Sequence, residues 1–204
     1  MANPMHVPRQ SSKMTLLEVA LQLFREKGHA ATTVDEICAR AGVTKGSFFH
    51  HFKNKEVLVL SAVEYWNDST DELFANADYH RATDPVERLL GYVDLRIEMI
   101  KGDIPEFTCL LGTLVQETYH THPAIREACD KALTAHIATL IPDLEQAKTL
   151  YAPAAAWSAE GVGYFIQSLI QGTFIFAKAK QDSHVVLESL QHLRRYLQTL
   201  FTKN

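Results

Sequence analysis

The sequence has few of the features that mark secreted, metal-binding or membrane proteins. Its 204 residues include three cysteines, Cys38, Cys109 and Cys129, whose odd number and irregular spacing indicate neither a disulfide framework nor a zinc cluster. The most apolar stretch, residues 162–177, is interrupted by polar side chains and is too short to span a bilayer. Residues 1–13 lack the apolar segment of a signal peptide. We therefore expect a soluble, cytoplasmic protein with no metal and no membrane partner.

Motifs of catalysis and cofactor binding are also missing. Nothing in the chain resembles a catalytic triad, a phosphate-binding loop or a paired-carboxylate site. The strings Glu26–His29 and Glu117–His120 have the Glu-x-x-His spacing of ligands in di-iron bundles. However, the first string includes Gly28 at an expected helix end, where a rigid bundle ligand does not fit. We expect no catalytic residue, no cofactor and no enzymatic activity.

Strands are not indicated, because alternating runs of β-branched residues are absent and almost every segment has a helical period. A first helix ends at Gly28, and a short second helix begins at Thr32 or Thr33 and ends at Gly42. A third helix follows directly, with Thr44 as its N-cap. Two short helices joined by a tight glycine-containing turn form a helix-turn-helix. The sequence therefore predicts an all-α protein that begins with a three-helix helix-turn-helix domain.

The remaining chain predicts a larger helical body. A fourth helix should begin near Asn54, and Asp84 and Pro85 open a later one as N-cap and first residue. Pro142 is expected to kink or split the helix that follows Pro123. We divide the chain into a flexible arm at residues 1–12, the helix-turn-helix domain at residues 13–56, and the helical body at residues 57–204.

Charge is divided unevenly between these parts. Residues 1–55 carry eight Lys or Arg and four Asp or Glu, a net charge of +4. The rest of the chain carries 12 basic and 20 acidic residues, a net charge of −8. This asymmetry indicates that the first quarter binds a polyanion.

Residues 41–56, AGVTKGSFFHHFKNKE, combine phenylalanines with basic side chains. Phe48 and Phe52 are four residues apart, so both can pack on the neighbouring helices. The opposite face can enter a DNA major groove and reach phosphates and base edges. The residues expected there are Lys45, Gly46, Ser47, Phe49, His50 and His51. Lys55 places a cation at the free amides of a helix start, which predicts a phosphate contact.

Residues 14–58 resemble the DNA-binding domain of the TetR family of bacterial transcriptional regulators. The matching positions are Phe24, Gly28, Thr32-Thr33-Val34, Ile37, Ala41-Gly42-Val43, Gly46, Phe48-Phe49, His51-Phe52 and Lys55-Glu56. The resemblance implies phosphate contacts by Thr33, Thr44, His51 and Lys55, and base contacts near Lys45, Gly46, Ser47 and His50. Phe49 departs from the tyrosine common in the family, so a phenol–phosphate hydrogen bond is missing there.

The resemblance also implies what the whole protein does. Family members bind a palindromic operator in double-stranded DNA as dimers, and a small effector in the helical body changes the spacing of the two DNA-binding heads. The expected protein is thus a ligand-responsive regulator, a repressor rather than an activator, whose body binds the effector and dimerises. A helical module that binds protein rather than DNA is an alternative, but the basic charge on residues 1–55 argues against it.

The last two predicted helices indicate a homodimer. Residues 154–179 are apolar on nearly every side, and residues 186–200 repeat apolar residues at coiled-coil spacing. The chain has few other helices to cover both, so we expect a second copy to do so in a four-helix bundle; an intramolecular bundle is the alternative. LIQGTFIFAKAKQD also resembles a family dimer helix, in which Gly172 would allow close approach. The expected interface is Phe165, Leu169, Gly172, Phe176, Val186, Leu190, Leu193 and Leu197.

Family members hold the effector in a cavity among the middle helices. The candidate lining is Trp66, Tyr92, Arg96, Phe107, Leu111, Leu114, Gln116, Tyr119, Trp157, Tyr164 and Gln167, although most of these residues would serve equally as ordinary core. Arg96 lies on an otherwise apolar helix and could pair with an anionic ligand or with Glu117, or be a solvated surface residue.

Cys109 offers a second means of sensing. Cys109-Leu110 resembles the cysteine that electrophile- or oxidant-responsive family members carry before a leucine-rich helix, although this chain has Thr108 where those members usually have glycine. A thiol at a helix N-terminus can become reactive through a lowered pKa. A buried structural cysteine is the alternative. Cys38 is expected in the core of the helix-turn-helix.

Overall fold

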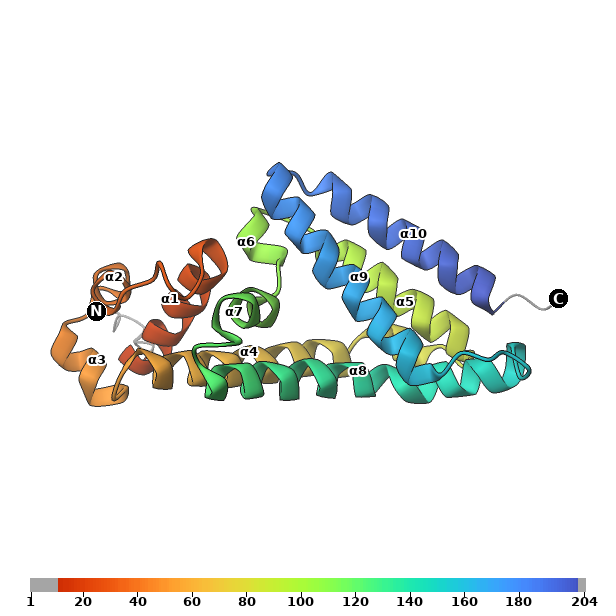
Figure 1. Cartoon of the computed structure of the whole chain (residues 1–204), viewed down its shortest axis with the longest axis horizontal. Coiled ribbons are helices and arrows are strands. Elements are labelled where there is room, and N and C mark those ends of the chain that lie inside the picture. The colour runs from red at the N-terminus through yellow and green to blue at the C-terminus, as the bar shows by residue number, and fades with distance from the viewer. Residues whose placement is uncertain (1–10, 202–204) are drawn as a thin grey trace, which may run out of the picture.

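The computed structural model describes residues 11–201, and the regular elements of this part of the chain are all helices, without a strand (Figure 1). The elements are α1 (Ser12–Lys27), α2 (Val34–Ala41), α3 (Lys45–His51), α4 (Lys55–Ala75), the 3-10 helix η1 (Asp78–Arg81), α5 (Pro85–Glu98), α6 (Ile104–Phe107), α7 (Leu110–Thr118), α8 (Pro123–Tyr151), α9 (Ala159–Lys180) and α10 (His184–Leu200). The all-α prediction is confirmed. We call α1–α3 the head and α4–α10 the body.

The helix boundaries in the head follow the capping residues of the sequence. Thr33 and Thr44 cap α2 and α3, each accepting a hydrogen bond from an amide in the first turn. Gly42 ends α2 in the left-handed conformation with φ of 64°, which glycine adopts without steric cost. Asn54 caps α4 in the same way as the two threonines. Because these capping signals are local, the ends of the head helices could be predicted from the sequence.

The body is built around two long helices that lie side by side, α4 and α8 (Figure 1). Helices α5, α9 and α10 pack together at the end far from the head, and α6 and α7 lie between this group and α1. Asp84 caps α5 by accepting from the Val86 and Glu87 amides, as expected. Pro142 lies inside α8, which continues through it to Tyr151, so the helix is not split there, and the alternative of a kink stays a prediction.

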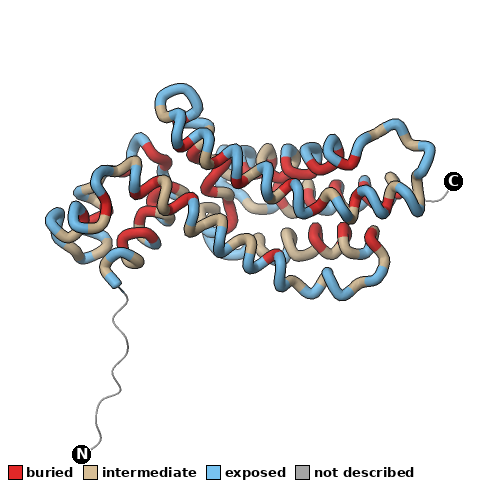
Figure 2. The backbone as a smooth tube through the Cα atoms, turned by 90° about the horizontal axis from the view of Figure 1, so that it is seen from below, coloured by how far each residue is buried: buried red, intermediate tan, exposed pale blue. Residues whose placement is uncertain are grey.

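Two apolar cores hold the molecule together, and one of them joins head and body. The first contains the buried faces of α5, α9 and α10. The second contains Phe48 and Phe52 from α3 together with Leu110 and Leu114 from α7 and Cys129 from α8. Figure 2 shows buried segments running from the head into the body. Because the head shares this core with α7 and α8, a shift of these helices would displace side chains that pack against the head.

The apolar seam of α10 is covered within the chain itself. Val186, Leu190, Leu193 and Leu197 are at most 1% exposed, and α10 packs on α5 and α9. These four residues are therefore covered within the chain and not by the second copy that we predicted, and the dimer itself stays a prediction. The seam spacing indicates a helix buried along one side, but it does not tell whether the neighbour belongs to the same chain.

The predicted flexible arm falls largely outside the described residues, which begin at Ser11. Of its last two residues, Ser11 is the N-cap of α1 and Ser12 is the first helical residue. The proposed domain boundary between residues 56 and 57 lies near the start of α4, which is continuous from head to body. Within residues 11–201, no helix is both long and apolar enough to cross a membrane.

Candidate DNA-reading surface and effector cavity

Helix α3 presents two chemically different faces, as the sequence indicated. Phe48 and Phe52 are buried, and Phe48 packs in the core with Ile37 of α2. On the other side Lys45, Gly46 and His50 are exposed, and Phe49 is 57% exposed with its ring edge against Phe48. Burying one phenylalanine stabilises the fold by about 1.5–3 kcal/mol, so the aromatic face fixes how α3 is presented.

The N-termini of α2 and α3 also reach the surface with polar groups. The exposed hydroxyls of Thr33 and Thr44 accept from the amides of Glu36 at 3.2 Å and Ser47 at 3.1 Å. A hydroxyl that accepts in this way keeps its own proton for another acceptor. Both threonines can therefore donate to a phosphate oxygen while they cap their helices.

Several cations of the head are held by acidic neighbours. Lys45 forms an ion pair with Asp35 of α2, with 2.7 Å between Nζ and Oδ1, and both side chains are largely exposed. This pair raises the pKa of Lys45 through the hydrogen bond to Asp35. Arg40 forms a bidentate pair with Glu26 of α1. Part of the positive charge of the head is thus neutralised locally, and the Lys45 ammonium group is engaged by Asp35.

Lys55 is directed into the protein rather than toward solvent. Its Nζ donates to the backbone oxygens of His29 at 2.9 Å and Thr32 at 3.0 Å, and desolvation lowers its pKa. An ammonium group has three donors, so one remains for a phosphate. The predicted phosphate contact by Lys55 is therefore reduced to that one donor and the free amides at the start of α4. His51 is likewise engaged, with Nε2 2.7 Å from the Ser12 hydroxyl oxygen.

Lys53 is a candidate that the sequence prediction missed. It is exposed in the loop between α3 and α4 and forms no ion pair within residues 11–201. Lys53 directly follows Phe52, whose buried ring anchors the end of α3, and this position in the sequence could have identified it as a candidate. Lys53 is thus an exposed cation near α3, without an ion pair in the described part of the chain, that can approach a phosphate.

A cavity of about 80 Å³ lies in the body, where α4–α9 meet α1 of the head. The predicted lining residues that it brings together are Trp66, Arg96, Phe107, Leu111 and Gln167, with Cys109 beside them. Tyr92 lies directly behind, and Gln167 Nε2 donates to its hydroxyl oxygen at 2.7 Å. The prediction missed Phe74, His136 and Arg25, which come from α4, α8 and the head.

Five predicted lining residues lie elsewhere. Leu114 is fully buried in the core shared by head and body, and Tyr119 is 62% exposed after α7. Trp157 packs edge-on against Phe201, and Tyr164 is exposed on α9. Gln116 is exposed and donates to the Gly112 oxygen. These residues were placed by their apolar or aromatic character, which does not distinguish a cavity from a core or an exposed face.

One wall of the cavity is a polar network around Tyr92. Its hydroxyl oxygen accepts from Arg96 Nε at 3.0 Å and lies 3.0 Å from His136 Nε2. Arg96 Nη2 lies 2.9 Å from the same imidazole nitrogen. Burial, and then the charge of Arg96, lower the pKa of His136 to about 3. His136 is therefore neutral at physiological pH and accepts a hydrogen bond here. The alternative pairing of Arg96 with Glu117 is wrong, because Glu117 binds the Ala30 amide instead.

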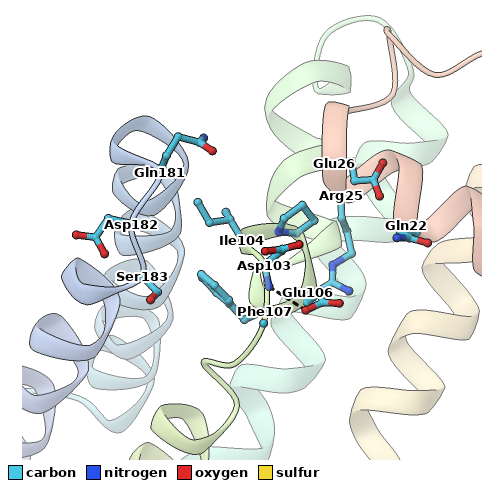
Figure 3. Close-up of a pocket in the computed structure, with 12 residues that line it drawn as sticks. Gln22, Arg25, Glu26, Asp103, Ile104, Glu106, Phe107, Gln181, Asp182 and Ser183 are labelled. Carbon is cyan, nitrogen blue, oxygen red and sulfur yellow. Dashed lines mark hydrogen bonds between the residues drawn. The ribbon is translucent and has the colours of Figure 1, made fainter.

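Arg25 connects the head to the cavity. Its Nε donates to the Thr108 backbone oxygen at 2.9 Å, and its guanidinium lies 4.7 Å from the Trp66 ring centroid. Burial lowers the pKa of Arg25 to about 10. Figure 3 shows Arg25 extending from α1 toward Glu106 of α6, beside a cleft of about 840 Å³ that reaches the α9–α10 turn. Arg25 is the head residue through which the cavity can influence α1.

Helix α9 carries an apolar stripe on the outside of the molecule. Phe165 and Phe176 are 43% and 58% exposed, and Tyr164 and Ile175 are exposed on the same side. A Cβ added to Gly172 would meet no atom within 4 Å, so the backbone is accessible there. Phe165 also contacts Tyr196 of α10, with 4.9 Å between ring centroids. Leu169 is half-buried and packs against the body core.

Cys109 lies at the start of α7 as its N-cap residue and is half-buried. The side chains of Arg25 and Lys178 lie within electrostatic reach of Cys109, and burial lowers the pKa of each of these two cations. Cys38 is buried in the head core as expected, where desolvation raises its pKa. Cys129 is fully buried, and burial raises its pKa to about 12. Cys109 is therefore the most accessible of the three thiols.

These features define a class of protein: a helix-turn-helix DNA-binding regulator with a helical body. Residues 16–62 match the family described as "Bacterial regulatory proteins, tetR family", and residues 85–192 match the C-terminal domain described as "Transcriptional regulator LmrA/YxaF-like". The second match alone covers more than half of the chain. The protein belongs to the TetR family of bacterial transcriptional regulators, and its relatives are regulators rather than enzymes.

Among individual proteins, the chain is similar to the transcriptional regulator YxaF of Bacillus subtilis, with 28% identity over 88% of this chain and 91% of YxaF. It is 38% identical to the regulator YerO of the same organism over 38% of this chain and 27% of YerO. It is also 38% identical to the repressor KstR2 of Mycolicibacterium smegmatis over 45% of this chain and 44% of KstR2. The last two alignments span less than half of those relatives.

The fold is shared with solved structures. The regulatory protein TetR from Rhodobacter sphaeroides superposes with a TM-score of 0.80 over 94% of this chain and 99% of that chain, at 23% sequence identity. This likeness shows the fold alone. It agrees with the family assignment that the two sequence matches provide.

Proposed function

We propose that the protein is a ligand-responsive repressor that binds a palindromic operator as a homodimer and leaves it when a small molecule occupies the body cavity. The observation that carries the proposal is the exposed face of α3, anchored from behind by two buried phenylalanines. The family relationship and the repressor activity in the name of KstR2 support it. As a regulator of transcription, it would act in the cytoplasm.

The DNA contacts are proposed in two groups. Gly46 and Ser47, with Lys45 once it leaves Asp35, are placed to meet base edges, and His50 extends the same surface. Phosphate contacts are assigned to Thr33, Thr44, Lys53, the free donor of Lys55 and the remaining polar edge of His51. Phe49, exposed beside these groups, offers apolar contact with a sugar or a thymine methyl group.

The dimer is proposed to form through α9 rather than through the buried seam of α10. The exposed stripe of Tyr164, Phe165, Ile175 and Phe176 needs a cover, because monomeric proteins rarely expose a contiguous patch of this kind. A second copy supplies the same stripe about a two-fold axis, which makes a self-complementary interface. Gly172 lies in the sequence between the pair Tyr164–Phe165 and the pair Ile175–Phe176, and it lets the two α9 helices approach closely. The contact of Phe165 with Tyr196 extends the patch to α10.

The effector site is proposed at the cavity beside Arg96. A cavity of about 80 Å³ is smaller than the roughly 300–1,000 Å³ of sites for drug-sized ligands, so a bound effector must be small or must part the surrounding helices. Parting would reach the head through Arg25 and through the core that α7 and α8 share with α3. The spacing of the two heads would then no longer match half-sites about 34 Å apart.

Selection of bound sequences from a random duplex library tests this function. We expect enrichment of a site with two inverted half-sites, bound by two protomers. An enriched site without two-fold symmetry, or no enrichment at all, would contradict the proposal. The enriched sequence also identifies the regulated gene and gives a defined duplex for the experiments below.

A second candidate function is redox or electrophile sensing by Cys109. Its partial exposure, and the nearby cations Arg25 and Lys178, favour this residue over the two buried cysteines. Mild oxidant should then release the wild-type protein from DNA, whereas Cys109→Ser should stay bound. Equal release of both proteins would end this hypothesis. Cys129→Ser is the matched control, since that thiol is fully buried.

A further inference from the structure

Arg96 is a cation without an acidic partner. Its guanidinium is held by neutral groups, the Tyr92 hydroxyl oxygen and His136 Nε2, and lies 4.4 Å from the Phe74 ring centroid. No carboxylate within residues 11–201 forms an ion pair with it. Partly buried charges are normally paired, so this arrangement leaves a site that favours a negative group.

Arg25 reaches the same cavity from α1 and is also without an ion pair in the described chain. Its interactions are the Thr108 backbone oxygen and the Trp66 ring. The nearest acidic group, Glu106, is used by the N-terminus of α6, where Oε2 accepts from the Asp103 amide at 2.8 Å. Two guanidinium groups from head and body therefore line one small cavity.

Most of the remaining lining is apolar and aromatic, although the Glu106 carboxylate and the neutral polar side chains of Asn67, Thr70, Gln167 and Gln171 also belong to it. Trp66, Phe74, Phe107 and Phe174 surround the cavity, together with Met99 and Leu111. Burial keeps His136 neutral, so this side chain adds no charge to the cavity. Such a wall suits a flat or short apolar body attached to an anionic group.

We propose that the effector is a compact organic monocarboxylate whose carboxylate binds between Arg96 and Arg25 and whose apolar body lies against Trp66 and Phe74. This rests on the proposed ligand-responsive function and names the chemical class of its ligand. Occupation draws the Arg25 guanidinium toward the carboxylate and away from the Thr108 oxygen. Because Arg25 belongs to α1 and Thr108 ends α6, the same step loosens the head from the body.

The chain provides its own reporter for this site. It contains two tryptophans, so Trp157→Phe leaves Trp66 as the source of tryptophan fluorescence. Trp157 packs on Phe201 away from the cavity, and its replacement keeps a ring there. Titration uses benzoate and hexanoate as probes, with benzamide, hexanamide and benzylamine as matched neutral and cationic compounds. We expect at least one carboxylate to change Trp66 fluorescence saturably, and its amide or amine to bind at least about tenfold more weakly.

Substitutions locate the charge that the carboxylate needs. In the Trp157→Phe background, Arg96→Gln should weaken carboxylate binding at least about tenfold, and Arg96→Lys should restore part of it. Arg25→Gln should weaken binding and abolish release of the selected duplex by the carboxylate. Arg126→Gln removes an exposed arginine that pairs only with Glu127 and should change neither property. Far-ultraviolet circular dichroism confirms that each variant is folded.

Three results would overturn the proposal: amides that bind as tightly as the acids, carboxylates that leave Trp66 fluorescence unchanged, or Arg96→Gln that binds with wild-type affinity. Binding of the selected duplex by the same proteins is measured in parallel. If the duplex binds normally while no carboxylate does, the ligand class is wrong and the DNA-binding function stands. If the duplex is not bound, the proposed function itself fails.

Discussion

The Glu117 carboxylate, in the body, accepts a hydrogen bond from the Ala30 backbone amide, in the head, at 2.9 Å. The same carboxylate fills the space above Gly28, where a side chain would otherwise lie. Lys55 of α4 adds to this junction by donating to the backbone oxygens of His29 and Thr32. In addition to the shared apolar core, polar contacts join head and body at this junction and at Arg25, and both contacts involve α1 or the turn that follows it.

Gly28→Ala should be destabilising for two reasons that can be separated. Its φ of 83° and ψ of 177° lie in a region open essentially to glycine, which costs about 1–3 kcal/mol for another residue. The new Cβ would also displace Glu117 and leave the Ala30 amide without its acceptor, a loss of about 0.5–1.5 kcal/mol. Urea unfolding of Gly28→Ala, Glu117→Ala and the double variant measures both parts. Strictly additive losses would refute the coupling between the two residues.

Asp35→Asn should strengthen DNA binding a few-fold at low salt. The substitution frees Lys45 from its ion pair and removes a negative charge beside the surface that meets phosphates. Fluorescence anisotropy with the selected duplex measures the affinity. Asp68→Asn makes the same change of charge at an exposed position of α4 and is the control. Equal effects of the two substitutions would show that only net charge matters.

Leu193→Ala and Phe176→Glu should have opposite effects on stability and assembly. Leu193 is fully buried between α10 and its neighbours, so truncation should cost about 2–5 kcal/mol and leave the folded protein dimeric. Phe176 is exposed on α9, so a charge there should leave the protomer folded and separate the dimer. Analytical ultracentrifugation and thermal unfolding give the two readouts. A Phe176→Glu variant that still sediments at twice the chain mass would contradict the α9 interface.

His136 should make the protein less stable as the pH falls. Its folded pKa is lowered to about 3, below the ordinary value of about 6.5 in an unfolded chain. The folded state therefore binds fewer protons between these values, and the free energy of unfolding decreases from pH 6.5 downward. His29, with its pKa lowered to about 4, acts in the same direction. Urea unfolding at several pH values should show a shallower decrease for His136→Gln than for the wild type, and equal slopes would exclude this role.

Much of the head could be predicted from the sequence because its signals are local. Thr33, Gly42, Thr44 and Asn54 determine helix ends by hydrogen bonds to neighbours three or four residues away. The division of α3 into an aromatic and a polar face follows from helical spacing alone. Helical spacing alone does not predict the direction in which a long side chain points. Lys55 turns inward because backbone oxygens of a distant loop meet it there.

The body could be predicted less well, since its site depends on contacts between remote segments. Arg96 was a reasonable candidate because a cation on an apolar helix is unusual, but its partner His136 lies 40 residues away and has no sequence motif. The leucine seam of α10 suggested a dimer because a buried stripe looks the same whether its cover is internal or external. The exposed stripe of α9 could not be recognised from the sequence, because this helix is apolar on nearly every side.

The most direct test of the central claim is the salt dependence of binding to the selected duplex by the wild-type protein and by Lys45→Ala. If the exposed face of α3 enters the groove, Lys45→Ala should bind at least several-fold more weakly at each salt concentration. If Lys45 also lies on a phosphate, the slope of log affinity against log salt should fall by about 0.9 for each protomer, or about two for a dimer. Unchanged affinity and unchanged slope would contradict the assignment of α3 as the element that reads DNA.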